Sequence, residues 1–148
     1  MSTWTLYAEL AEAGKYRKRQ GFISFDRTTV MVPGALLSGT LQLTHVSTST
    51  SAGVRLWGGS QPLFGTDAAE ACDITAGAQL LDTALMGDIV ASGQAWLHVP
   101  LDQLAGTVVQ FRLDLDTSCP FNKTTNQWRL EGPGSTTAPP VLWLNFQP

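Results

Sequence analysis

The chain has 148 residues, enough for one domain with a sizeable core, and 43% of them are hydrophobic. Charged residues make up only 14%, against roughly 25% in typical soluble domains, so hydroxyl groups supply much of the polar surface. The net charge of −3 argues against a nucleic-acid partner, and no apolar run reaches the roughly 20 residues of a transmembrane helix, so no membrane partner is expected either.

Alternating strand patterns dominate the first third of the chain. Trp4 and Leu6 alternate with threonines, which predicts a half-buried strand near the N-terminus. Residues 21–26 (GFISFD) give the next strand. Residues 40–45 give a third strand after a Pro-Gly turn, again with apolar and polar side chains in alternation.

A polar run, STSTSAG, follows at residues 47–53. Small hydroxyl residues favour turns, and Gly53 would allow a positive φ angle at little cost. The alternation resumes at residues 54–57. This pattern predicts a hairpin in which a long polar loop joins two antiparallel strands, 40–45 and 54–57.

Residues 67–91 carry the helical signals of the chain. An Ala-rich turn over 67–72 and another turn over 78–86 fit this segment, and glycines such as Gly87 interrupt it. A strand over residues 83–90 is the alternative. Short helical turns within a long connection are therefore expected.

The last third returns to strands, at residues 94–99, 107–116, 126–130 and 141–146, and both faces of the last strand look buried over part of its length. Short strands spaced by Gly, Pro, Ser and Thr turns predict an all-β protein. The expected fold is a jelly-roll sandwich of about eight antiparallel strands with one or two short helical turns. It forms a single globular domain, with residues 1–20 as an N-terminal strand or arm and 21–148 as the jelly roll.

The order of these segments resembles a known jelly-roll layout. Residues 21–58 match it with an aromatic-Asp strand, a Pro-Gly turn, the strand SGTLQL, a polar loop and a short return strand. Residues 93–116 are similar to its later strands, and residues 126–146 to its closing pair. The layout occurs in carbohydrate-binding-module-like domains of secreted bacterial proteins and in structural proteins of tailed phages. A solitary, charge-poor chain of this size most resembles an auxiliary (decoration) protein of a phage head, including those of thermophilic phages.

This resemblance implies a structural protein that forms a homo-oligomer, expected to be a trimer, and binds the major capsid protein to reinforce the shell. It would lie on the capsid exterior of the virion after synthesis in the host cytoplasm. The first 20 residues lack a basic region followed by an apolar stretch, which agrees with a cytoplasmic origin. The alternative function is a carbohydrate-binding module that recognises glycans through exposed tryptophans.

Signals for catalysis are weak. The two histidines, His45 and His98, lie within alternating strands, and His45 is expected at the edge of the core. The sequence has no GxSxG, HExxH, Gly-rich phosphate loop or CxxC pair. We therefore predict no catalytic, cofactor-binding or metal-binding residue, and an enzyme is the least favoured class. Cys72 and Cys119 fit reduced cysteines best, and a disulfide between them stays open.

Asp114 and Asp116 share one face of the strand over 107–116, about 7 Å apart. Two carboxylates at this spacing could flank a sugar or hold Ca²⁺ with backbone oxygens. The favoured interpretation is a solvent-facing strand whose carboxylates interleave with Arg112 and limit edge-to-edge aggregation.

Partner-binding candidates fall into two groups. A basic stretch could form an arm that docks on an acidic capsid surface, or could equally be a solvated loop; it comprises Lys15, Tyr16, Arg17, Lys18 and Arg19. Exposed tryptophans could anchor an interface or stack on sugars; the candidates are Trp4, Trp96 and Trp128. Trp57 and Trp143 are expected in the core.

Overall fold

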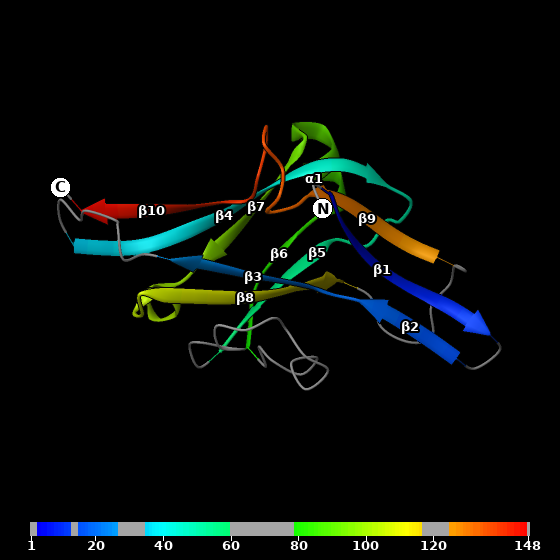
Figure 1. The fold of residues 1–148 in the computed structure, drawn as a ribbon, viewed down its shortest axis with the longest axis horizontal. Coiled ribbons are helices and arrows are strands. Elements are labelled where there is room, and N and C mark those ends of the chain that lie inside the picture. Colours follow the sequence, from blue (N-terminus) through cyan, green and yellow to red (C-terminus); the bar gives the residue numbers. More distant parts are fainter. Residues whose placement is uncertain (1–2, 13–14, 27–34, 60–78, 117–124, 148) are drawn as a thin grey trace.

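The computed structural model describes residues 3–12, 15–26, 35–59, 79–116 and 125–147 (Figure 1). Within these residues the chain forms two antiparallel β-sheets packed as a sandwich. The large sheet has the strand order β10 (Val141–Gln147), β4 (Ala35–Thr48), β9 (Thr125–Glu131), β1 (Thr3–Glu12) and β2 (Lys15–Arg19), and β7 (Gln94–Val99) also pairs with β4. The small sheet has the order β3 (Gly21–Asp26), β8 (Val108–Leu115), β5 (Val54–Gly58) and β6 (Gln79–Ala84).

The predicted fold class is confirmed: the protein is an all-β, jelly-roll-like sandwich. The described residues hold ten strands instead of about eight, because the basic stretch and residues 79–84 each form a strand of their own. Helix is limited, within these residues, to α1 (Met86–Ser92) and a 3₁₀ turn, η2 (Leu101–Leu104).

The helical segment was only partly predicted. The expected turn over 78–86 is wrong, because most of it forms strand β6. The helix begins at Met86, contains Gly87 and ends at Ser92; its C-cap is Gly93, whose φ of 77° lies in the left-handed region that favours glycine. The expected turn over 67–72 lies outside the described residues.

The core lies between the two sheets, where the alternating apolar side chains predicted from the sequence meet. A fully buried Leu or Phe side chain contributes roughly 1.5–3 kcal/mol through removal of apolar surface from water. The largest buried side chains come from both sheets, from α1 and from η2: Leu6, Leu41, Leu43, Leu56, Ile89, Leu97, Leu104, Phe111, Leu113, Leu115, Trp128 and Leu130.

The long strand β4 organises the large sheet. Its first part pairs with β10 over Ala35–Gln42, and its last part pairs with β9 over His45–Thr48. Strand β7 pairs with residues 39–44 of β4 from the opposite edge to β10. β10, β4 and β7 thus form a three-stranded platform at one end of the molecule (Figure 1).

The predicted hairpin between β4 and β5 is wrong, because β4 belongs to the large sheet and β5 to the small one. The polar run carries the chain across the edge of the sandwich. Its hydroxyls bind its own backbone and β9: Thr48 Oγ1 donates to the Gln127 carbonyl (3.1 Å), and the Ala52 N–H donates to Thr50 Oγ1 (3.0 Å). Gly53 has no positive φ; a Cβ there would lie 2.4 Å from the carbonyl oxygen of Ala84, so close packing explains the glycine.

Strand β1 is a full member of the large sheet. It pairs with β9 over Thr3–Glu9, and the buried Leu6 lies opposite Trp128. Strand β2 then pairs with β1 and forms the far end of the sheet. The division of the chain into an arm over 1–20 and a domain over 21–148 stays a prediction.

Candidate binding surface

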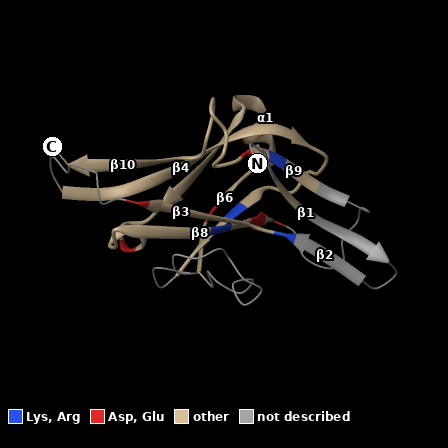
Figure 2. Ribbon diagram, in the orientation of Figure 1, with Lys and Arg blue, Asp and Glu red and all other residues tan. Residues whose placement is uncertain are grey.

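The outer face of the platform carries no acidic side chain, no lysine and no arginine. Strands β4, β7 and β10 contain no Asp, Glu, Lys or Arg, and Figure 2 shows all three without a blue or red segment. Residues paired across antiparallel strands share a face, so the register defines the uncharged face. It consists of Ser38, Thr40, Gln42, Thr44, Gln94, Trp96, His98, Val141, Trp143 and Asn145.

Two tryptophans stand out on the uncharged face. Trp96 is 49% exposed and Trp143 is 52% exposed. Gln42 lies opposite Trp96 in the register, and its Oε1 accepts a hydrogen bond of 2.7 Å from Trp143 Nε1. The surface therefore presents two aromatic rings, one of them held in place by this hydrogen bond, surrounded by amides and hydroxyls.

A groove borders the uncharged face at Trp96. It has a volume of about 440 Å³ and lies between the end of β6, helix α1 and the start of β7. One carboxylate, Asp88, lines it together with exposed Leu85. Its other lining residues are Thr83, Ala84, Ile89, Ala91, Ser92, Gln94 and Trp96.

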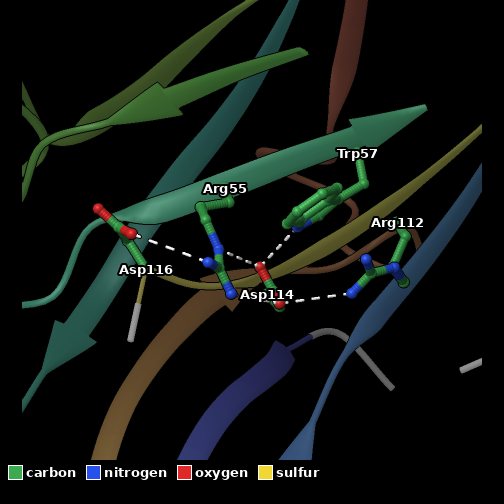
Figure 3. A network of polar contacts seen from close by, with 5 residues as sticks. All are labelled: Arg55, Trp57, Arg112, Asp114 and Asp116. Atoms are coloured by element: carbon green, nitrogen blue, oxygen red, sulfur yellow. Dashed lines mark hydrogen bonds and ion pairs between the residues drawn. The ribbon is translucent and has the colours of Figure 1, made fainter. Parts of the chain in front are cut away.

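The outer face of the small sheet is organised around one carboxylate (Figure 3). Asp114 accepts hydrogen bonds of 2.8 Å from both Nε and Nη2 of Arg55, and another of 2.8 Å from Trp57 Nε1. Arg112 Nη1 adds a contact of 3.3 Å. The Trp57 ring lies between the two guanidinium groups, at 5.2 Å from Arg55 and 4.7 Å from Arg112, which adds cation–π attraction.

This Asp114 network is largely removed from water. Asp114 is only 3% exposed, and burial lowers the pKa of Arg112, an effect that the neighbouring Asp114 carboxylate opposes. A guanidinium titrates so far above neutral pH that Arg112 stays charged. The interpretation of Asp114 as a solvent-facing carboxylate is therefore wrong. Exposed Asp116 contributes only a distant contact, 3.9 Å from Arg55 Nη1.

Metal or sugar binding by the two aspartates finds no geometric support. Both Asp114 oxygens already accept hydrogen bonds from guanidinium groups, and two positive charges beside them would repel a cation. Across the described ranges, no three His, Cys, Asp or Glu residues gather where they could hold a metal ion.

Three tryptophans are placed differently from the predictions, and two of them, Trp128 and Trp143, lie on the large sheet. Trp96 is exposed, as predicted. Trp128 is fully buried: it shares a face with Leu130, packs edge-on against His45 at 5.2 Å, and donates from Nε1 to the Ala52 carbonyl at 2.7 Å. Trp143, expected in the core, is exposed because it shares the outer side of β10 with Asn145.

The remaining site predictions are only partly described. Trp57 is half-buried against its arginines instead of lying in the main core. His45 lies at the core edge, as predicted, and His98 is exposed. The basic stretch forms β2, at the opposite end of the large sheet from β10, so it does not join the uncharged face. Arg19 is exposed. The side chains of Trp4, Lys15, Tyr16, Arg17 and Lys18, like Cys72 and Cys119, lie outside the description.

The uncharged face was missed in the sequence, although a signal for it exists. Residues 35–48, 94–99 and 141–147 are all free of charged residues, and their period-2 patterns place polar side chains opposite the core. The sequence pattern does not show that these three segments pair side by side in one sheet.

In comparisons with known proteins, no family model, curated protein or solved structure matches the chain. Neither of the described helices has the length and apolar character needed to cross a bilayer. Any functional assignment therefore depends on the surface itself and on the resemblance in the sequence.

Proposed function

We propose that this chain is a non-catalytic structural protein that associates with itself and decorates the exterior of a phage capsid. One observation carries the proposal: three neighbouring strands present a face without Asp, Glu, Lys or Arg, on which Trp96 and Trp143 are each about half exposed. Interface centres are depleted in charge and enriched in tryptophan, so this face suits contact with another protein.

The energetics of such a contact are favourable. Covering hydroxyl and amide side chains costs much less desolvation energy than covering ions, provided that the polar groups find hydrogen-bond partners. Gln42 and Ser38 already accept hydrogen bonds within the face, from Trp143 (2.7 Å) and from Asn145 Nδ2 (3.1 Å). A ligand that binds only the assembled shell stabilises it by mass action, which is how decoration would reinforce a capsid.

The choice of partner comes from the sequence. The resemblance of residues 21–58, 93–116 and 126–146 to phage decoration proteins suggests the major capsid protein as the partner and an oligomer, expected to be a trimer, as the unit that binds. The exterior of the virion would be its location, after synthesis in the host cytoplasm.

Co-sedimentation with empty heads of the phage that encodes the chain tests this function. We expect the wild-type chain to pellet with the heads, and Trp96→Thr and Trp143→Thr to bind at least tenfold more weakly. Leu80→Thr is a matched control, because Leu80 is 49% exposed but lies on the small sheet. Failure of the wild type to bind, or equal binding by all four proteins, would contradict the proposal.

Glycan recognition is the second candidate, and the groove beside Trp96 favours it. Sugar hydroxyls pair with carboxylates, amides and hydroxyls, and Asp88, Gln94 and Ser92 supply these groups next to an exposed indole. A glycan array probed with the purified chain separates the two functions. Binding to an oligosaccharide that is lost in Trp96→Thr but kept in Leu80→Thr would replace the capsid with a glycan as the partner.

A further inference from the structure

Strand β10 is an edge strand without the usual protection. In the described part of the large sheet its one neighbouring strand is β4, and Figure 1 shows it along the margin of the molecule with the C-terminus. Natural edge strands are commonly guarded against pairing by lysine, proline or inward-pointing charges. Residues 141–147 read VLWLNFQ and contain none of these.

The register shows which backbone groups of β10 face outward. The His45 N–H donates to the Gly93 carbonyl on the β7 side (2.9 Å). Backbone N–H and C=O groups of successive residues point to opposite edges of a strand. Those of the odd-numbered residues 39–43 therefore also point to β7, and those of the even-numbered residues point to β10. The even-numbered residues of β4 pair with Val141, Trp143 and Asn145. The N–H and C=O groups of Leu142 and Leu144 are therefore directed away from β4, where an added strand would lie.

The other described edges are less suited to a second copy of the chain. Strand β2 reads KYRKR and would repel itself, β3 ends in Asp26, and β6 contains Asp82. The outer edge of β7 is blocked, because the Asp82 carboxylate accepts a hydrogen bond of 2.7 Å from the His98 N–H. Two copies that meet along β10 bring no like charges of these strands together, which argues for the chain itself as the occupant.

We propose that two copies of this chain pair through β10 as antiparallel strands, so that the two large sheets become one. The two-fold axis passes beside Trp143. Leu142 of each copy then exchanges N–H···O=C hydrogen bonds with Leu144 of the other, which uses all of the outward groups identified above. The two Trp143 residues face each other as a non-hydrogen-bonded pair with Cα atoms about 4.5 Å apart, and the indoles contact each other across the axis.

This pairing deepens the proposed function, since it specifies how the chain associates with itself. It predicts a two-fold unit, whereas the resemblance alone suggests a trimer. The two ideas fail separately: a dimer that does not bind phage heads removes only the capsid partner, and a trimer that binds heads removes only the β10 pairing.

Light scattering measures the mass of the full chain in solution, for wild type and for variants that carry a positive or a negative charge at the two-fold axis. We expect wild type to have about twice the 15.9 kDa mass of one chain. Trp143→Lys and Trp143→Glu should each shift the protein toward monomer, because like charges would face each other. An equimolar mixture of the two should restore the dimer. Trp96→Lys, a matched change on β7, should stay dimeric.

A cross-linking measurement avoids reliance on introduced charge. In a chain with Cys72→Ser and Cys119→Ser, Trp143→Cys places two thiols at a spacing that a disulfide can bridge, so mild oxidation should give a covalent dimer, and Trp96→Cys should not. Either a wild-type monomer or trimer, or equal cross-linking of the two cysteine variants, would overturn the proposal. So would a charge-variant mixture no more dimeric than its components.

Discussion

The outer faces of the two sheets carry different kinds of polar group. On the small sheet, Asp114, Arg55 and Arg112 turn their charges toward one another and lose most of their contact with water. On the platform of the large sheet, amides and hydroxyls take the polar positions and two indoles are half exposed.

A sheet face can therefore be rich in polar groups and still offer few of them to a ligand. The Asp114 network consumes its hydrogen-bonding capacity internally, so it holds strands β5 and β8 together and offers little to a ligand. The uncharged face loses its water at a low free-energy cost and keeps its rings accessible. A partner should therefore bind the platform of the large sheet at a lower desolvation cost than the Asp114 network of the small sheet.

The largest expected effect comes from removing the central charge of the network. Asp114→Asn keeps the shape of the side chain but removes the negative charge that the largely buried guanidinium groups of Arg55 and Arg112 share, which should lower the free energy of unfolding by about 3 kcal/mol. Urea unfolding measures this change. Asp116→Asn is the control and should cost less than about 1 kcal/mol, since Asp116 is exposed. Equal losses in the two variants would refute the central role of Asp114.

A smaller loss is expected when the charge is kept and its geometry changed. Arg55→Lys retains the positive charge, but an ammonium group cannot make the two-pronged contact with Asp114 or stack its plane on Trp57. The free energy of unfolding should fall by about 1–2 kcal/mol. Arg129→Lys, at an exposed position of β9, should change it by less than about 0.5 kcal/mol. If the Arg55→Lys variant were as stable as wild type, charge alone would explain the network.

The smallest effect on stability is expected where a charge is added to the uncharged face. His98→Lys changes an exposed side chain on β7, so the free energy of unfolding should stay within about 0.5 kcal/mol of wild type in a thermal or urea melt. Under the proposed function, binding to phage heads should nevertheless weaken, because the new charge would have to lose water at the contact. A variant that is destabilised by more than about 1 kcal/mol would mean that the face needs its neutrality for folding.

Much of the fold could be predicted from alternation alone. Alternation predicts strands over residues 94–99 and 107–116 and places Leu97 and Phe111 on their inward sides, and both side chains are fully buried. The partner of each strand could not be predicted in the same way. The long polar loop between them predicts that β4 and β5 form a hairpin, but a loop sequence does not reveal a change of sheet.

The candidate site was harder to predict, since alternation identifies residues that share a face but not what covers that face. The alternation of Asp114 with apolar residues predicts an exposed carboxylate, yet both sides of β8 are buried. The polar neighbours of Trp128 in the sequence predict an exposed ring, although its period-2 partner Leu130 indicates the core. The same period-2 argument places Trp143 on the side of Asn145, which indicates the surface.

The crossing of the chain from β4 to β5 has a kinetic consequence. Neither sheet can be completed from a continuous stretch of sequence: β1 must find β9, and β3 must find β8, across most of the chain. Such distant pairings incur the entropy cost of loop closure before their contacts stabilise anything, so the chain should fold slowly for its size, in milliseconds to seconds. The two layers should then form and melt together as one cooperative unit.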